Sequence, residues 1–482
     1  MALLIGNGKY HLGPLANPAN DARAIAESLL GMKFNVKVLL DATLREMTDG
    51  IKGYIDRVSR ENAIGLFYYA GHGAQLAWRN FLIPVDATIG HLEDIPQQAY
   101  ELNLLLGGLA KAVNPMNIII LDACRDNPFG NRVLPEQKGL SQFDAPPGSL
   151  LAYATSPGNT ASDGSGANGL FTEHLLREMR NPQAKIEDVF KRVRLNVRLQ
   201  SNGQQIPWES TSLEDDFYFV PQGEKPRDSR DEAGAKLQEE RALWDGAAGS
   251  PDPKLTEAYL SRYPNGIYSE LAQARLDKLL AAQGEKKLEV VSSTANPFSK
   301  GSAKGVGSYS IGDRFSYAEK DPISGVVQKT FTEVVTSADE FSTSFDGGKR
   351  ILDLLGNEIK SPITRFLTPA QFYPAEYVVG QKWITKFQWL KGDGIPSFME
   401  LGFRVVERRN VAVSAGTFNA FVVEGSGQVV GGGAWRVSYL IDPDKCSRPI
   451  VMEMIGKGRI GGRYDPLSHK MELLEFRQMR PG

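Results

Sequence analysis

The chain has 482 residues, of which 41% are hydrophobic and 23% are charged, a composition typical of ordinary globular proteins. This length exceeds that of one ordinary core, so we expect two or three domains. The 55 Lys and Arg residues nearly balance the 57 Asp and Glu residues, and a net charge of -2 gives no global field that favours polyanions. We therefore expect no binding to nucleic acid or to an anionic membrane.

The sequence contains no run of about 20 apolar residues, the length that a membrane-spanning helix requires. Its first apolar run, "ALLIG", begins at residue 2, and no charged-then-apolar leader precedes it. The sequence as given predicts a cytoplasmic protein, whereas a leader outside this sequence would direct it to the periplasm or out of the cell. The two cysteines, Cys124 and Cys446, lie in unlike contexts, so no disulfide framework is indicated.

Residues 1–222 alternate short apolar runs with amphipathic segments, a pattern typical of a parallel sheet covered by helices. The expected strands are 2–6, 34–40, 63–70, 117–123 and 149–155. The expected helices are 17–30, 43–60, 169–179 and 186–200. Two of these helices have clear start signals, because Pro18 follows Asn17 and because Glu46 lies three residues after Thr43.

The rest of the chain differs in composition from this first part. Residues 223–285 predict a charged linker followed by a helical hairpin that breaks at residues 264–266. Residues 286–308 are rich in Ser, Gly and Lys, which predicts a flexible linker. Residues 309–482 alternate β-branched and aromatic residues with polar ones, which predicts an all-β sandwich or barrel. One expected use of this β domain is to bind a protein partner.

Two apolar runs of the first part end at residues whose side chains can take part in catalysis. The run "GLFYYAGHGAQ" carries His72 between Gly71 and Gly73, which leave room beside the histidine for another chain or a ligand. The run "IIILDACRD" places Cys124 at the carboxyl end of its strand, where open α/β sheets hold their ligands. Since neighbouring strands lie about 4.8 Å apart, the imidazole and the thiol are expected to meet at this edge.

These motifs carry a resemblance to a known family. "YYAGHG" followed by "LDACRD", with the cysteine 52 residues after the histidine (72 to 124), resembles the caspase–metacaspase clan of cysteine peptidases. "ALLIGNGKY", "RNFLIPVDA" and "TASDGSGANGLFTEHLL" resemble further segments of the clan in the same order. The resemblance covers residues 2 to about 220 and points to the bacterial metacaspase-like branch. It implies a three-layer α/β/α sandwich with a mostly parallel sheet, and a cysteine endopeptidase activity.

Departures from the family pattern bear on specificity. Caspases carry Gln-Ala-Cys-x-Gly, whereas this chain has Asp122 in place of the glutamine, which resembles metacaspases that cleave after Arg or Lys. Ala70 stands where metacaspases commonly have a serine. The acidic pair of the calcium-dependent relatives is absent from "YELNLLL", so we expect no obligatory calcium, no other metal and no cofactor.

The residues fit a two-residue mechanism of amide hydrolysis. Cys124 is the expected thiolate nucleophile, and His72 is expected to protonate the leaving amine and then to activate water. Backbone N–H groups of Gly73 and Cys124 are the expected oxyanion donors. Asp122 lies two residues before the cysteine, and the resemblance of "NPANDA" to a metacaspase segment adds Asp21; both are expected to bind a basic P1 side chain.

Plainer interpretations stand beside these. Asp122 also fits a hydrogen-bonded carboxylate at a strand end, and Asp21 fits a first-turn aspartate favoured by the helix dipole. The alternative function is an inert caspase-like scaffold that acts through its C-terminal β domain. A nucleotide-binding loop in "GNGKY" is rejected, because the third glycine and a later Lys-Ser/Thr pair are missing.

The insert after the cysteine strand is rich in Pro, Gly and polar residues, and it contains Arg132 and Lys138. Loops of this composition are open to proteolysis. An enzyme that cuts after basic residues is therefore expected to cut itself after one of these two positions.

Overall fold

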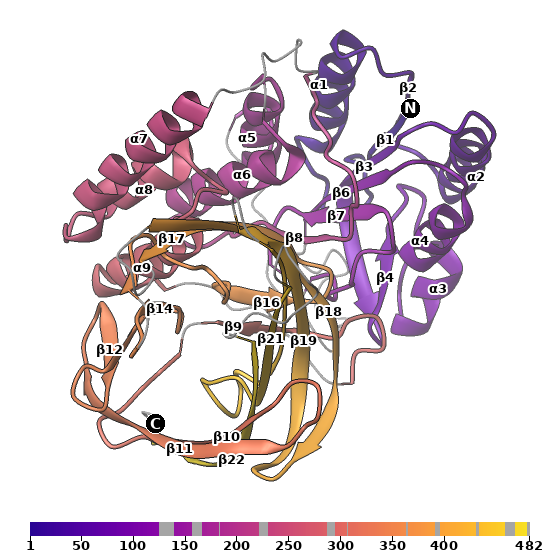
Figure 1. Ribbon diagram of the computed structural model, residues 1–482. Coiled ribbons are helices and arrows are strands. Elements are labelled where there is room, and N and C mark those ends of the chain that lie inside the picture. The colour runs from indigo at the N-terminus through magenta and orange to yellow at the C-terminus, as the bar shows by residue number, and fades with distance from the viewer. Residues whose placement is uncertain are drawn as a thin grey trace. The chain divides into compact units, whose positions relative to one another are not determined.

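The protein is described by a computed structural model (Figure 1) that covers residues 1–124, 139–156, 166–182, 184–220, 230–286, 295–305, 307–362, 365–390, 396–429, 433–457 and 468–479. The chain divides into two compact units. The first comprises Met1–Ala235 with Ala281–Gly301, and the second comprises Lys236–Leu280 with Ser302–Gly482. Arg132 and Lys138, the expected sites of self-cleavage, lie outside the described residues.

The first unit is built on a mostly parallel sheet with the strand order β2-β1-β3-β6-β7-β8. The strands are β1 (Ala2–Gly6), β2 (Val36–Leu40), β3 (Gly65–Leu76), β6 (Asn117–Cys124), β7 (Ser149–Tyr153) and β8 (Trp208–Thr211). Neighbours from β2 to β7 run parallel, and β8 runs antiparallel to β7 at the edge. The short strands β4 (Arg79–Leu82) and β5 (Tyr100–Glu101) continue from the end of β3 as an antiparallel extension.

Helices cover both faces of this sheet (Figure 1). One face carries α1 (Pro18–Gly31), α5 (Leu170–Met179) and α6 (Ile186–Gln200). The other carries α2 (Leu44–Arg60) and α4 (Leu102–Lys111), and the short η1 (Leu92–Asp94) and α3 (Ile95–Gln98) precede α4 along the chain. Residues along β3 alternate between the faces: Tyr68 joins the core under α1, whereas Phe67 lies 6.4 Å from Tyr54 of α2, between ring centroids. The predicted α/β/α sandwich is confirmed.

Local sequence signals explain where these elements begin. The Thr43 side chain accepts a hydrogen bond from the Glu46 backbone and the Glu46 side chain accepts one from the Thr43 backbone, so the predicted capping box of α2 is confirmed. One expected boundary is wrong. The third strand does not stop at residue 70 but runs on to Leu76, because after His72 it leaves β6 and pairs with β4 instead.

The second unit begins with helices. They are α7 (Arg230–Ala248), whose first residues belong to the first unit, α8 (Pro253–Arg262) and α9 (Ser269–Ala282). The helices α8 and α9 form the predicted hairpin, and the carboxylate of Glu240 ties α7 to it. This carboxylate accepts hydrogen bonds from the Tyr259 hydroxyl at 2.7 Å and from the Ile267 backbone N–H at 2.6 Å. Within the described residues, no helix is long and apolar enough to cross a membrane.

The remainder of the second unit is a closed antiparallel barrel, which confirms the predicted all-β domain. Its strands are β10 (Arg314–Lys320), β11 (Val327–Ala338), β12 (Ser342–Phe345), β13 (Arg350–Asp353), β14 (Glu358–Lys360), β15 (Arg365–Phe366), β17 (Lys382–Leu390), β18 (Pro396–Val413), β19 (Gly416–Val429), β20 (Ala434–Ile441), β21 (Val451–Lys457) and β22 (His469–Arg477). The strands β9 (Ser302–Lys304) and β16 (Glu376–Val378) form a separate two-stranded sheet.

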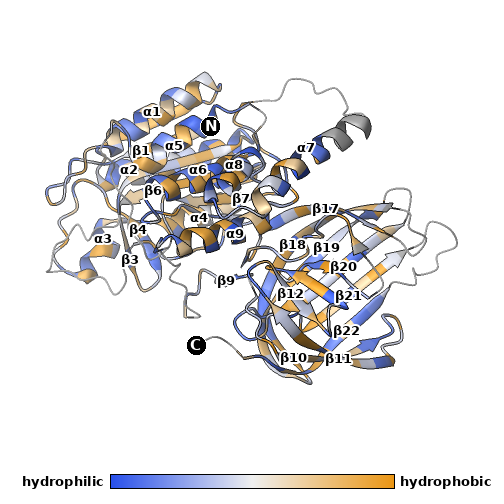
Figure 2. Ribbon diagram, turned by 90° about the vertical axis from the view of Figure 1, so that its left-hand side faces the viewer, coloured by the Kyte–Doolittle hydropathy of each residue, from blue (hydrophilic) through white to orange (hydrophobic). Residues whose placement is uncertain are grey.

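Hydrophobic and hydrophilic residues alternate along the barrel strands (Figure 2). Buried and exposed residues alternate along β17 and β20, as expected for strands with one face in a core. Aromatic side chains dominate the buried face, and Tyr377 of β16 stacks on Phe421 of β19 with 5.6 Å between ring centroids. The Tyr439 hydroxyl donates to the Phe372 carbonyl at 2.6 Å, so the segment that precedes β16 is also held to the barrel, by a polar contact.

A buried carboxyl in the barrel predicts a pH dependence. Asp353 ends β13, and its carboxylate accepts backbone N–H groups of Leu355 and Asn357, each at 2.9 Å. Burial raises the pKa of Asp353 from 3.8 to about 6. The folded protein therefore holds this proton more tightly than the unfolded chain does, and the group's contribution to the free energy of unfolding falls as pH rises from about 4 to about 6.

We expect Asp353→Asn to remove this dependence, because the amide oxygen still accepts both backbone groups and does not ionise. Between pH 4 and pH 7 the free energy of unfolding of the wild type should fall relative to the variant by about 3 kcal/mol. Urea unfolding followed by near-ultraviolet circular dichroism at several pH values measures this difference. A difference that does not change with pH would contradict the assignment.

Candidate active site

The parallel pairing of β3 with β6 brings the two predicted catalytic positions together. The Cα partners across this pair are Ala70 with Asp122, Gly71 with Ala123, and His72 with Cys124. Neighbouring strands of a sheet lie roughly 4.7–4.9 Å apart, so the backbones at 72 and 124 are close enough for one substrate residue to span them. Cys124 is the last residue of β6 and is placed here through its backbone.

The ring of His72 is held by a loop that follows the first strand. The His72 side chain is buried, and its Nε2 lies 2.6 Å from the carbonyl oxygen of Gly13. Because a carbonyl can only accept, Nε2 is the protonated nitrogen of the neutral ring and Nδ1 carries the lone pair. The ring of Tyr10 packs against the imidazole with 4.4 Å between centroids.

Two tyrosines also fix the backbone at His72. The His72 N–H donates to the Tyr10 hydroxyl at 3.0 Å, and the Tyr69 hydroxyl donates to the His72 carbonyl at 2.7 Å. A Cβ on Gly71, where φ is +152°, would lie 2.6 Å from the Tyr10 hydroxyl and 2.8 Å from the Tyr69 hydroxyl. The room beside Gly71 therefore serves these two side chains rather than a ligand or another chain, which corrects the expectation from sequence.

Gly73, the predicted oxyanion donor, is closely packed. A Cβ at this position would lie 2.9 Å from Cδ2 of Leu140 and 3.2 Å from the Cβ of Ala123. Leu140 is fully buried, and the following Ser141 donates its N–H to Asn80 of β4 at 2.7 Å. The segment that re-enters the described chain at residue 139 thus lies directly against the edge that carries Gly73.

Asp122 lies in a pocket of hydroxyl groups. Its side chain is 9% exposed, and its Oδ2 accepts hydrogen bonds from the Thr172 hydroxyl at 2.7 Å and from the Tyr68 hydroxyl at 3.4 Å. The same two hydroxyls lie 2.7 Å from each other. These contacts fix the orientation of the carboxylate, as the plainer strand-end interpretation also requires.

Asp21 lies in the first turn of α1, and its carboxylate reaches the start of α5. Its Oδ1 accepts hydrogen bonds from the Asn168 side-chain amide at 2.8 Å and from the Gly169 N–H at 3.0 Å. Burial raises the pKa of Tyr68 well above its usual range, and the charges of Asp122 and Asp21 raise it further. The charges of both carboxylates therefore act on one hydroxyl, and Asp122 also contacts it directly.

Residues 295–301 pack on the segment beside the site, although their composition predicts a flexible linker. The Asp144 N–H donates to the Phe298 carbonyl at 2.9 Å, and the Asp144 carboxylate accepts from the Ser299 hydroxyl and the Lys300 N–H, both at 2.8 Å. The rings of Phe143 and Phe298 lie 4.7 Å apart between centroids. We call residues 295–301 the docked segment.

Sequence reasoning missed three contributors to this edge. Gly13 and Tyr10 lie in the loop after β1. Because β1 is the neighbour of β3 in the sheet, this loop lies at the same sheet edge as His72, and the loops at that edge are the signal that could have identified both residues. The docked segment has no such signal, because its partner at residues 143–144 is more than 150 positions away along the chain.

Comparison with known proteins defines the class of the first unit. Residues 1–218 match the family model described as the caspase domain of peptidase family C14. The match to the caspase domain spans nearly the whole of the predicted range, so the resemblance predicted for residues 2 to about 220 is confirmed.

Two curated relatives match part of the chain. The chain is 30% identical over 179 residues to mucosa-associated lymphoid tissue lymphoma translocation protein 1 of Homo sapiens, and to the homolog of that protein in Mus musculus. Each match covers 36% of this chain and 21% of the relative, so the chain spans about a fifth of their length. Both relatives are mammalian, and the bacterial branch of the family stays a prediction.

The contacts of the docked segment lead to a stability prediction. Phe298→Ala removes the ring that covers Phe143, so the backbone bonds of Asp144 should open more often and amides at 139–145 should exchange about tenfold faster or more. Hydrogen–deuterium exchange with mass spectrometry measures this. Phe34→Ala, a half-buried phenylalanine before β2 at the far edge of the sheet, is the matched control, and equal exchange in both variants would refute the role.

Proposed function

We propose that the caspase domain is a cysteine endopeptidase that hydrolyses peptide bonds after basic residues, Arg in preference to Lys. The observation that carries this proposal is the register that pairs His72 with Cys124 at the carboxyl end of β6. The geometry of the imidazole and the two buried aspartates beside it support the chemistry and the specificity, respectively.

The proposed mechanism follows from the tautomer of His72. With Nε2–H bound to the Gly13 carbonyl, Nδ1 is the nitrogen that takes the proton of the Cys124 thiol. The carbonyl dipole stabilises the imidazolium, which lowers the pKa of a neighbouring thiol and raises the thiolate fraction. The imidazolium then protonates the leaving amine, and the neutral ring activates water to hydrolyse the thioester. Backbone N–H groups of Gly73 and Cys124 are the proposed donors to the oxyanion.

Specificity for a basic P1 residue rests on Asp122 and Asp21. Both carboxylates are buried near Tyr68, and Asp122 lies two residues before the nucleophile. A pair of carboxylates repels an acidic P1 side chain and attracts a cation. Guanidinium forms a two-bond fork with a carboxylate that an ammonium group does not form, so Arg is preferred to Lys.

Loss of either catalytic side chain should abolish hydrolysis. We expect Cys124→Ala and His72→Ala each to lower kcat/KM on an Arg peptide by roughly a thousandfold or more, because each removes a group that acts on the reacting atoms. Cys446→Ala, which removes the buried barrel cysteine, should keep the wild-type rate. Retention of most of the rate by either catalytic variant would refute the dyad, whereas a wild type that hydrolyses no peptide would favour the inert scaffold acting through the β domain.

The choice of P1 residue tests the pocket separately. On fluorogenic peptides that differ only at P1, we expect the order Arg, Lys, neutral, Asp. Asp122→Asn should lose roughly tenfold to a hundredfold on Arg peptides, because a charge-assisted contact in a partly desolvated pocket is lost. Its thiol should still react with a small neutral alkylating agent, which shows an intact dyad. A wild-type preference for Asp at P1 would refute the pocket assignment and leave the dyad standing.

A further inference from the structure

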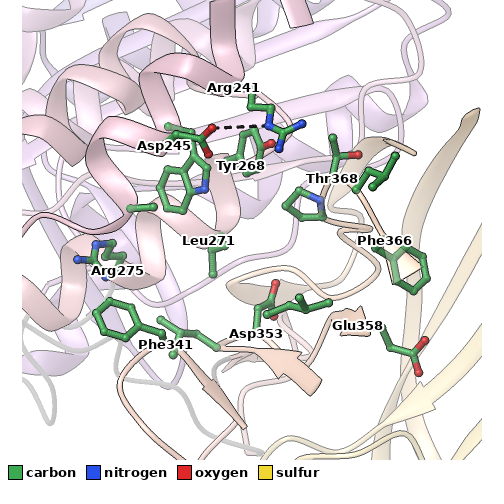
Figure 3. A pocket seen from close by; sticks show the side chains of 16 residues that line it. Arg241, Asp245, Tyr268, Leu271, Arg275, Phe341, Asp353, Glu358, Phe366 and Thr368 are labelled. Carbon is green, nitrogen blue, oxygen red and sulfur yellow. Dashed lines mark ion pairs between the residues drawn. The ribbon is translucent and has the colours of Figure 1, made fainter. Parts of the chain in front are cut away.

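The second unit contains a pocket that no part of the proposed peptidase mechanism uses (Figure 3). It has a volume of about 290 Å³ and is lined by α7, α9 and the region of strands β13 to β15. Small-molecule sites usually span roughly 300–1,000 Å³, so this pocket suits a ligand about the size of one amino acid. Four aromatic residues belong to its lining: Trp244, Tyr268, Phe341 and Phe366.

The pocket is lined by a buried guanidinium that has no carboxylate partner. Arg275 of α9 is 7% exposed, and among the described residues its Nε has no hydrogen-bond partner and it forms no ion pair. Burial lowers the pKa of Arg275, and the charge of Glu340 opposes that shift from beyond ion-pair distance. Its Nη2 donates to the Ser250 carbonyl at 2.8 Å, and its Cζ lies 4.8 Å from the ring centroid of Phe341. A buried charge is costly unless an opposite charge or further hydrogen bonds meet it.

The other charges that line the pocket already have partners. Arg241 and Asp245 form an ion pair with 3.6 Å between Nε and Oδ2, and Glu358 pairs with Arg350 of β13. The carboxylate of Asp353 is held by two backbone N–H groups of its own turn. Arg275 is thus the charged lining residue that forms no ion pair within the described chain; the charge of Glu340 acts on it only from beyond ion-pair distance, and an anionic ligand would supply a close partner.

The aromatic walls restrict what this anion is attached to. Trp244 and Tyr268 stack with 5.4 Å between centroids and 14° between planes, while Phe341 lies against Arg275 at one end of the pocket (Figure 3). Flat apolar walls bind a ring or a branched apolar body better than they bind a small hydrated anion. The lining therefore combines one cationic end with an aromatic body site.

We propose that this pocket binds a small organic carboxylate with an aromatic or apolar body, the carboxylate at Arg275 and the body against Trp244, Tyr268 and Phe341. Two sources share this chemistry: a free carboxylic acid and the C-terminal residue of a short peptide. The proposal does not depend on peptidase activity, because the pocket lies wholly within residues of the second unit.

Calorimetric titration of the full chain tests the proposal with five probes. N-acetyl-phenylalanine should bind. Its amide, which lacks the negative charge, should bind at least tenfold more weakly, and so should the acetate ion, which lacks the aromatic body. Phenylpropionate and an acetylated dipeptide ending in phenylalanine then distinguish a free acid from a peptide terminus by which binds more tightly. Equal affinity for N-acetyl-phenylalanine and its amide, or no binding of any probe, would overturn the proposal.

Variants assign the binding to this pocket. Arg275→Gln should weaken N-acetyl-phenylalanine binding by about tenfold to a hundredfold and leave the amide unaffected. Arg241→Gln is the matched control, since that guanidinium lines the same pocket but pairs with Asp245, and it should change the affinity less than threefold. Phe341→Leu keeps all charges and should weaken binding of the acid and the amide alike. An unchanged affinity in Arg275→Gln, with a wild-type melting temperature, would overturn the proposal.

Discussion

The parallel pairing of β3 with β6 is the constraint on which the candidate active site depends. Residues 66–69 and 118–121 are buried almost completely, and their side chains alternate between the cores on the two faces of the sheet. A shift of the pairing by one residue would move each of these side chains to the opposite face. The apolar core therefore fixes the register, and the register alone sets position 72 beside position 124.

Hydrogen bonds, in addition to this register, fix the orientation of the His72 ring and backbone. The Gly13 carbonyl selects the tautomer of the ring, and the hydroxyls of Tyr10 and Tyr69 hold the backbone N–H and carbonyl. An unmade hydrogen bond at such a buried site costs about 1–3 kcal/mol, so the arrangement resists rotation of the ring or the strand. Gly71 permits it, because any side chain there would displace both hydroxyls.

The sequence was sufficient for elements with a strong period or a local start signal. The expected ranges of β1, β2, β6, β7, α1, α2, α5 and α6 agree with the observed bounds to within about two residues, since buried strands and amphipathic helices repeat over distinct periods. The strands β4, β5 and β8 and the helix α4 were not predicted. The juxtaposition of His72 and Cys124 was predictable because two cysteines and five histidines leave few pairs to consider. Closure of the barrel was not, because β10 and β22 join residues such as 314 and 477, and alternation says nothing about which edges meet.

Contacts made by loops escaped prediction for the same physical reason. The docked segment is held by backbone and side-chain hydrogen bonds and by one aromatic pair, and none of these depends on a repeating pattern. Its partner segment packs Leu140 against Gly73, so residues 295–301 are linked to the proposed oxyanion donor through one short stretch of chain. A region whose composition predicts flexibility thus becomes part of the support of the active-site edge. Burial of Phe143 and the hydrogen bonds to the Asp144 carboxylate stabilise the docked conformation, and this outweighs the flexibility that the local composition favours.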